Sequence, residues 1–272
     1  MEKLKHAVGL FSPDANLGHK RLKKLAAEFS LPELSCSEKD MLRLDVLASE
    51  LRLTGHLPGE SKGRVLPVCS RPEELVTTVF RGGRQDVPLY RSVLGRRKPH
   101  STTVLDLTGG LGQDGWLLAA FGCSLMVVEQ EAVIFALLRD GVARAGIVDQ
   151  PVARRLRLIY APAQEILAQI LDAGGNGRQK LMLPRPDVVY LDPFFSSERK
   201  RKGACKRSMQ VLRFVANAQA NENISDLLDL GLQVATDRVV VKRPRVCSAL
   251  DTGFGRRVHS IQGRGHRFDI YK

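Results

Sequence analysis

The sequence predicts an α/β protein with a Rossmann-like, mostly parallel sheet of seven strands and a small N-terminal α/β subdomain. Two observations carry this prediction. From about residue 100, short apolar runs alternate with helical patterns, and the first run leads directly into a glycine-rich turn. Alternating strands and helices form parallel sheets that helices cover on both faces. The apolar runs are nearly continuous, as expected for strands buried on both sides.

The strands and helices of the main domain follow from apolar periodicity. Parallel strands are expected at 102–107, 124–129, 156–161, 187–192 and 238–243, before a closing antiparallel pair at 256–263 and 266–271. Helices are expected at 113–121, 132–146, 164–172, 206–218 and 224–235.

The N-terminal part has a weaker pattern. We expect a strand at 6–11, a helix at 19–29, and a strand or helix at 41–53. Residues 55–72 are rich in Gly, Pro and Ser and are expected to form a connection. The predicted organisation is a small α/β subdomain (1–75), a basic Gly-containing connection (76–99) and a main domain (100–272).

Composition narrows the class of protein. A net charge of +13 is typical of chains that meet a polyanion, most often nucleic acid, although a solvated basic surface is the alternative. Five scattered cysteines without a C-x-x-C pair favour free thiols over a zinc site or disulfides, and no metal is expected. No apolar run is long enough to span a bilayer, and the N-terminus lacks a secretory pattern, so a cytoplasmic location is expected.

The first candidate site is the glycine-rich turn D-L-T-G-G-L-G-Q-D, which runs from Asp106 through Gly112 to Asp114. Glycines allow a sharp turn and close approach of a ligand, which in such folds binds beyond the carboxyl ends of the strands. A carboxylate at Asp106 would repel the pyrophosphate of a dinucleotide. It suits the ammonium and sulfonium groups of S-adenosylmethionine, although Asp106 could also cap a helix.

Two further strand ends complete the predicted cofactor site. Glu129 ends the second strand, 23 positions after Asp106, where a carboxylate can accept both ribose hydroxyls. An exposed strand-end acid is the alternative. The third strand ends at Pro162 and Ala163, a loop expected to face the adenine ring.

The second candidate site is Y-L-D-P-F-F, which contains Asp192, Pro193 and Phe195 at the end of the fourth strand. It resembles the (D/N)-P-P-(Y/F) signature of methyltransferases that act on exocyclic amino groups. The lone pair of an aromatic amine is delocalised, and a carboxylate or carbonyl that accepts its N–H bonds would localise it. An aromatic face at Phe194 or Phe195 would stack the base. A buried strand end with two core phenylalanines is the alternative.

Basic residues gather around these strand ends, where phosphate contacts would give affinity without reading sequence. Each run alone could be a solvated face. The predicted RNA contacts are Arg84, Arg199, Lys200, Lys242, Arg243 and His266.

Together, VLDLTGGLGQDGWLLAAFGC, VVEQ, VVYLDPFF, VVVKRP and GHRFDIY resemble the bacterial small-subunit ribosomal RNA guanine-N2 methyltransferases of the J type. The resemblance spans about residues 80–272 and is fainter over 1–75. It implies a class I S-adenosylmethionine-dependent methyltransferase with strand order 3-2-1-4-5-7-6. It also implies methylation of the N2 amine of a guanine in 16S rRNA, with naked RNA or the small ribosomal subunit as partner.

Carried over by position, the resemblance assigns cofactor contacts to seven residues. The seven are Gln113, Asp114, Glu129, Gln130, Pro162, Ala163 and Asp192. The family often has basic residues in place of Gln113 and Gln130, and small hydroxyl residues in place of Pro162 and Ala163. At these four positions, either the side chain or the backbone could make the contact.

Other functions remain open at this point. An N-methyltransferase acting on another RNA, on DNA or on a protein amide would use the same motifs. A non-catalytic RNA-binding relative would keep the charge but bind no cofactor. A nicotinamide-dependent oxidoreductase would require a pyrophosphate site free of Asp106.

Overall fold

The structure is a computed structural model of the chain. It describes residues 8–13, 17–35, 42–57, 65–74, 76, 86–172, 183–193, 207–217, 224–253, 256 and 258–272.

A seven-stranded sheet forms the centre of the larger part of the molecule, in the order β10-β11-β9-β8-β5-β6-β7. Its strands are β5 (Thr103–Asp106), β6 (Ser124–Glu129), β7 (Leu156–Tyr160), β8 (Val188–Leu191), β9 (Arg238–Pro244), β10 (Val258–Gln262) and β11 (His266–Tyr271). The first five are parallel, and β11 pairs antiparallel with both β9 and β10. In chain order this is 3-2-1-4-5-7-6, so the predicted fold class is confirmed.

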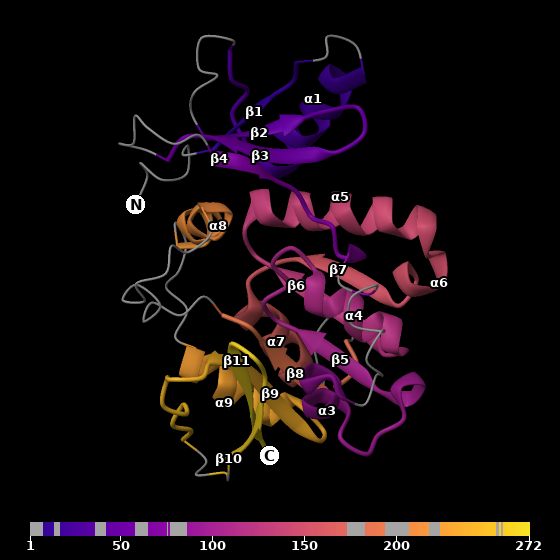
Figure 1. Ribbon diagram of the computed structural model, residues 1–272, viewed down its shortest axis with the longest axis vertical. Helices are drawn as coiled ribbons and strands as arrows, with labels where there is room; N and C mark the ends of the chain where they lie inside the picture. The colour runs from indigo at the N-terminus through magenta and orange to yellow at the C-terminus, as the bar shows by residue number, and fades with distance from the viewer. Residues whose placement is uncertain are drawn as a thin grey trace.

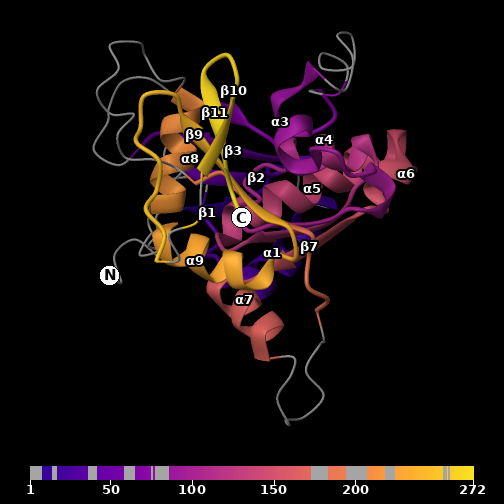
Figure 2. The same cartoon turned by 90° about the horizontal axis from the view of Figure 1, so that it is seen from below.

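Helices cover both faces of this sheet. Successive residues of a strand point to opposite sides, and here both sides carry apolar residues that must be buried. On β8, Val188 and Tyr190 belong to one apolar cluster and Val189 and Leu191 to the other. Figure 2 shows α3, α4 and α5 on one side of the sheet and α7 and α9 on the other. The helices are α3 (Pro88–Leu94), α4 (Gln113–Phe121), α5 (Ala132–Val148), α6 (Gln150–Ala153), α7 (Ala163–Leu171), α8 (Arg207–Asn217) and α9 (Ile224–Val234), with a 3-10 turn at Pro99–Ser101.

A second sheet of four strands forms from the N-terminal residues, in the order β1-β2-β3-β4. Its elements are β1 (Gly9–Phe11), α1 (Leu17–Phe29), β2 (Arg43–Val46), β3 (Leu51–Gly55) and β4 (Val65–Val68). The ambiguous segment 41–53 contains the antiparallel pair of strands β2 and β3. The segment 55–72 is not only a connection, because it contains β4. Pro67 made this strand resemble a loop, but β4 lies at the sheet edge, where proline is tolerated.

The predicted connection 76–99 also contains structure. Pro88 begins α3, whose buried face includes Leu89 and Val93. This helix packs against β11, β10 and α4, so it belongs to the larger sheet. The boundaries at residues 75 and 99 stay a prediction.

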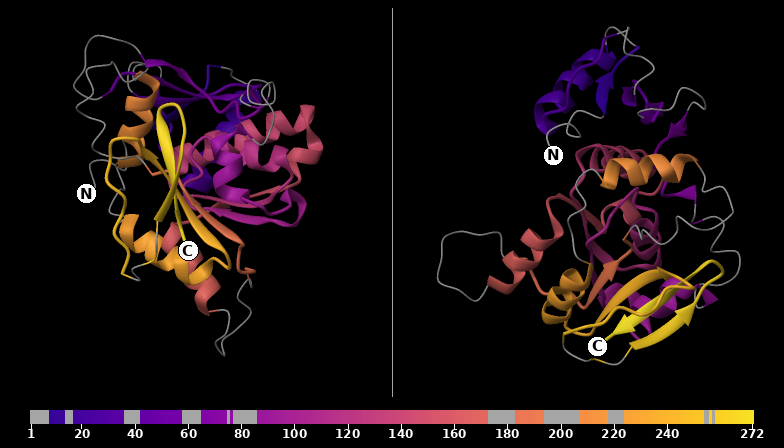
Figure 3. Two further views of the ribbon diagram at one scale, coloured as in Figure 1. Left: turned by 60° about the horizontal axis from the view of Figure 1, so that its bottom comes forward. Right: turned by 90° about the vertical axis from the view of Figure 1, so that its left-hand side faces the viewer.

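Helices α5 and α8 lie between the two sheets (Figures 1 and 3). One continuous apolar cluster joins the N-terminal sheet to α5, α8 and the α4 face of the larger sheet. A helix in this position must be apolar on most sides. Accordingly, eleven of the residues of α5 from Ala132 to Ala145 are buried.

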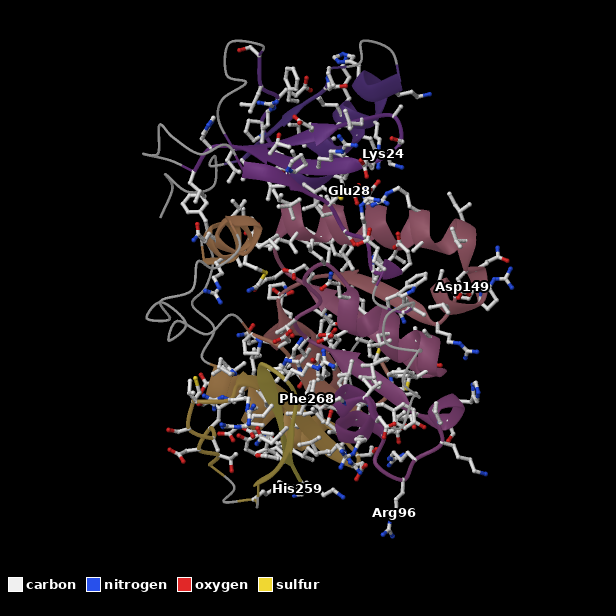
Figure 4. The ribbon with its side chains drawn as sticks, viewed as in Figure 1. Lys24, Glu28, Arg96, Asp149, His259 and Phe268 are labelled. Carbon is white, nitrogen blue, oxygen red and sulfur yellow. The ribbon has the colours of Figure 1, made fainter. Side chains whose placement is uncertain are left out.

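Asp140 on α5 is the polar centre of this contact. Its carboxylate pairs with Arg21 of α1 and, at 3.0 Å, with Arg144, and it accepts a 3.1 Å hydrogen bond from the Leu51 N–H of β3. Asp140 is 7% exposed, so these bonds are shielded from solvent. At the rim of the same contact, Glu28 of α1 faces α5 (Figure 4) and pairs with Arg139.

We expect Asp140→Ala to lower the free energy of unfolding by about 2–3 kcal/mol, because a buried N–H and two guanidinium groups lose their carboxylate partner. Urea unfolding at pH 7 measures this loss. Glu28→Ala, at the exposed rim, is the matched control and should cost less than about 0.5 kcal/mol. Equal losses in the two variants would show that Asp140 does not hold the two sheets together.

Candidate cofactor and acceptor site

The parallel strands bring their carboxyl ends to one edge of the larger sheet. Asp106 ends β5, Glu129 ends β6, Asp192 follows β8, and Lys242 lies near the end of β9. These residues are far apart in the chain, but the strand order β9-β8-β5-β6 makes their strands neighbours. The cofactor and acceptor motifs predicted from the sequence therefore meet at a single edge.

The glycine-rich turn is closely packed against β6 and α5. The Gly109 N–H donates to the Val128 carbonyl at 2.8 Å. Gly112 has φ +80°, and a Cβ there would lie 2.4 Å from the Leu138 side chain, so only glycine fits. Gly110 has φ +53°, and the nearest atom to a Cβ there, the Thr108 carbonyl oxygen, lies 3.8 Å away. The turn therefore leaves an open face at Gly110.

Asp106 is buried behind this turn, with 2% of its surface exposed. Its carboxylate accepts the Thr108 N–H at 3.0 Å, whereas α4 begins at Gln113, and Gly112 is its N-cap without a side-chain cap bond. The helix-cap alternative for Asp106 is therefore wrong. Burial raises the pKa of Asp106 to about 7, and the carboxylates of Asp114 and Asp192 add to the shift.

Glu129 is half-buried and faces the turn. Its carboxylate accepts the Gly110 N–H at 2.9 Å and the Glu131 N–H at 2.8 Å. These bonds orient it toward the glycines, so it is not a freely exposed strand-end acid. Glu131, which precedes α5, is buried, and desolvation together with Glu129 raises the pKa of Glu131 to about 7.

A network of ionic hydrogen bonds links the two motifs. The Lys242 ammonium donates to Asp114 at 2.7 Å and to Asp192 at 2.9 Å. The Tyr190 hydroxyl donates to the same Asp114 oxygen at 2.6 Å, and the Asp192 N–H donates to the Thr108 hydroxyl at 2.6 Å. Asp114 on α4, the strand end of β8 and Lys242 on β9 therefore form one unit.

The pKa values in this network follow from burial and charge. Desolvation raises the pKa of Asp114, but the bonds from Lys242 and Tyr190 outweigh it and the net shift is downward. Desolvation raises the pKa of Asp192, and Lys242 offsets only part of this rise. Desolvation lowers the pKa of Lys242, but the two carboxylates raise it above its ordinary value, so the ammonium stays charged.

The adenine loop predicted at Pro162 and Ala163 lies between β7 and α7, with Pro162 exposed and Ala163 buried. The ring of Tyr160, at the end of β7, contacts the ring of Phe29 from α1 edge-to-face, with 5.3 Å between the ring centroids. Phe135 from α5 contacts the same tyrosine ring, also at 5.3 Å. The N-terminal subdomain thus contacts the strand end that leads into this loop.

The remaining predicted positions occupy different environments. Gln113 is exposed at the start of α4, while Gln130 and Pro193 are half-buried. Lys242 shares its sheet face with Phe268, its partner on β11, and the half-buried His266 lies edge-on at 5.0 Å from the Phe268 ring. Figure 4 shows Phe268 inside the molecule and His259 at its margin. Phe195, Arg84, Arg199 and Lys200 lie outside the described residues.

Lys242 and Arg243 were predicted to share a role as phosphate contacts, but they differ in the structure. Successive strand residues face opposite sides, so Lys242 faces the α4 side and Arg243 the α9 side. Arg243 is only 7% exposed. It interacts with Tyr271, whose pKa it lowers, although burial raises that pKa overall. Phosphate contact by these two residues stays a prediction.

The sequence did not identify Thr108 and Tyr190 as residues of the site. It predicted Lys242 as an RNA contact and not as a partner of Asp114 and Asp192. Thr108 and Tyr190 lie inside the quoted motifs, two positions from Asp106 and Asp192 respectively. That proximity was the only available signal. Their bonds depend on the order of the strands, which the sequence does not reveal directly.

The donor set fits S-adenosylmethionine. The cofactor is cationic at its sulfonium and ammonium groups and carries two ribose hydroxyls, and this edge offers Asp106, Glu129 and an open glycine face. Among the described residues, no cluster of three or more His, Cys, Asp or Glu side chains could hold a metal. In the same part of the chain, no helix has the length and apolarity required to cross a membrane.

Fold and site together define an S-adenosylmethionine-dependent methyltransferase, and a family model described in those terms matches residues 27–272. The chain is 34% identical to ribosomal RNA small subunit methyltransferase J of Coxiella burnetii, over 91% of this chain and 90% of that protein. It is also 34% identical to the protein of that name from Thioalkalivibrio sulfidiphilus, over 92% of each. A crystal structure of a methyltransferase from Neisseria gonorrhoeae superposes with a TM-score of 0.67 at 25% identity, over 97% of this chain and 95% of that one. The chain belongs to the ribosomal RNA small subunit methyltransferase J family.

We expect Asp106→Asn to raise the melting temperature of the cofactor-free protein at pH 8. The pKa of Asp106 is about 7 in the folded chain and 3.8 ordinarily, so the folded state holds the proton more tightly. The contribution of this group to stability therefore falls as pH rises from about 4 to 7. Calorimetry should show the advantage of the variant growing across that interval and levelling off above it. A constant difference at every pH would contradict this expectation.

The same substitution should weaken S-adenosylmethionine binding roughly tenfold at pH 8, because the site loses a negative charge that attracts the cationic cofactor. In the unaltered chain, affinity should increase as pH rises through about 7, and Asp106→Asn should flatten this dependence. Isothermal titration calorimetry measures both effects. Asp251→Asn, which changes an exposed acid after β9, is the control. Unchanged affinity in Asp106→Asn would exclude a role for this carboxylate in cofactor binding.

Proposed function

We propose that this chain transfers a methyl group from S-adenosylmethionine to the N2 amine of a guanine in 16S ribosomal RNA. The observation that carries the proposal is Asp192, half-buried at the strand edge beside the cofactor turn and bound by Lys242. Curated relatives that share 34% identity over most of the chain are named for methylation of small-subunit ribosomal RNA.

The chemistry of the acceptor explains why a carboxylate is needed. The N2 lone pair of guanine is delocalised into the ring, so the amine is a weak nucleophile. An Asp192 oxygen that accepts an N2–H bond would localise the lone pair and would receive the proton that the amine loses when it is methylated. The cofactor, when bound, supplies an electrophilic methyl group on a sulfonium. Most of the remaining rate gain comes from holding the amine in line with that methyl group.

The charge of the chain supports an RNA acceptor. Arg245 follows β9 and Arg264 lies in the turn before β11, so both are at the sheet edge that carries Asp192, and both are exposed. Such side chains can contact phosphates without reading sequence. Stacking of the guanine on Phe195, and phosphate contacts by Arg84, Arg199, Lys200 and His266, are further parts of the proposal. A cytoplasmic location, and naked RNA or the small subunit as substrate, complete the proposal.

The test is transfer of tritium from labelled S-adenosylmethionine to 16S RNA and to small subunits from a strain that lacks the enzyme. We expect transfer to one site, with N2-methylguanosine identified by mass spectrometry. Asp192→Ala should reduce kcat at least roughly 100-fold, because it removes the hydrogen-bond and proton acceptor. Asp251→Ala should leave kcat unchanged.

Competition between 16S RNA, unrelated RNA, DNA and protein separates the alternative acceptors. Methylation of DNA or of a protein amide in preference to 16S RNA would overturn the proposed substrate. Full activity in folded Asp192→Ala would overturn the proposed acceptor site. Binding of RNA without binding of S-adenosylhomocysteine would indicate a non-catalytic RNA-binding protein.

A further inference from the structure

The bridge formed by Lys242 has a consequence for the reaction. Its ammonium lies between Asp114, which belongs to the first turn of α4 beside the cofactor turn, and Asp192, which follows β8. Lys242 and Asp114 are largely shielded, with exposed side-chain fractions of 22% and 20%, whereas 39% of the Asp192 side chain stays open to solvent. The lysine therefore joins the cofactor side of the site to the acceptor side.

Two carboxylates bind the Lys242 ammonium, and neighbouring groups hold both of these residues in place. Tyr190 donates to the same oxygen of Asp114 that Lys242 binds, so that carboxylate is held by two donors. The Thr108 hydroxyl accepts the Asp192 N–H, which fixes the backbone of the acceptor residue. Within the described residues, Lys242 is the only donor to the Asp192 carboxylate, and it binds oxygen Oδ2. The Oδ1 oxygen is left to accept a bond from a substrate.

We propose that Lys242 is a positioning residue, which orients the Asp192 carboxylate toward the acceptor amine and couples it to α4. This inference rests on the proposed function, since it concerns the same acceptor site. Lys242 does not contact the reacting atoms. It fixes one oxygen of Asp192, keeps the carboxylate charged, and ties its position to the helix that follows the cofactor turn.

The charges around Asp192 explain why its carboxylate needs Lys242 to stay ionised. The groups that face the cluster are Asp106 from β5, Asp114 from α4, Tyr190 from β8, Lys242 from β9 and His266 from β11. Asp106, Asp114 and Asp192 contribute three carboxylates to this cluster, and Lys242 contributes the one ammonium. Without Lys242, burial and the Asp114 charge would raise the pKa of Asp192 further, and its protonated form could not take up the proton that the amine releases.

Lys242→Met tests the proposal, with the methyltransferase assay run from pH 5.5 to 9. We expect kcat at pH 7 to fall roughly 10- to 100-fold with little change in the KM for RNA, because a misplaced acceptor slows the chemical step. The rate requires ionised Asp192, so its acidic limb should move to higher pH, and raising the pH should recover part of the loss. Lys242→Arg, which keeps the charge, should restore the acidic limb toward that of the unaltered enzyme.

The matched control is Lys272→Met, which removes another lysine–aspartate pair, with Asp237 at 3.5 Å beside the opposite end of β9. It should change neither kcat nor the pH profile. A folded Lys242→Met enzyme with an unchanged kcat and pH profile overturns the proposal. So does an equal loss at every pH that Lys242→Arg does not relieve, since that would indicate a merely structural role.

If Lys242→Met does not fold, Tyr190→Phe supplies the test. It keeps every charge and the buried ring, but releases Asp114 from one of its two donors. A several-fold lower kcat with unchanged KM supports the coupling through α4, and an unchanged kcat overturns it. Failure of the proposed function is distinguishable, because the unaltered enzyme would then transfer no methyl group to 16S RNA.

Discussion

The ion pairs of Lys242 with Asp114 and Asp192 are the interactions on which the site depends. Burying carboxylates is unfavourable unless each finds a partner, and three of them converge at this edge. One ammonium serves two of them. Burial raises the pKa of Asp106 to about 7, because its hydrogen bonds to Thr108 offset only part of the desolvation and the charges of Asp114 and Asp192 add to the rise. The free site therefore carries excess negative charge, which a cofactor with a sulfonium and an ammonium would neutralise.

A second constraint holds the N-terminal sheet against this machinery. Asp140 fastens β3 and α1 to α5, and the same helix carries Leu138, against which Gly112 packs. Phe29 extends the contact to the ring of Tyr160. The N-terminal subdomain therefore supports both the cofactor turn and the loop expected to face adenine. The N-terminal sheet and α1 thus have a structural task besides any contact with RNA.

Much of the fold was predictable from the sequence, because the signals were local. Apolar runs placed the seven strands, and Asp106, Glu129 and Asp192 followed from their positions at strand ends. The failures are also physical. Pro67 concealed an edge strand, and α3 is a short helix within a segment that resembles a linker. Lys242 and Arg243 look alike as a basic pair, but the period of two in a strand sends one into the site and the other into the opposite layer.

The opposite signs of the site and of the whole chain indicate a division of tasks in RNA recognition. The chain carries +13, and Arg245 and Arg264 are exposed at the site edge, whereas the cluster itself holds three carboxylates and one lysine. Phosphates are attracted to the arginines and repelled by the carboxylates. A nucleobase is uncharged, so it can enter without that repulsion, provided that it leaves its stack. The acidic cluster that suits a cationic cofactor therefore disfavours a phosphate beside Asp192 and favours an uncharged base there.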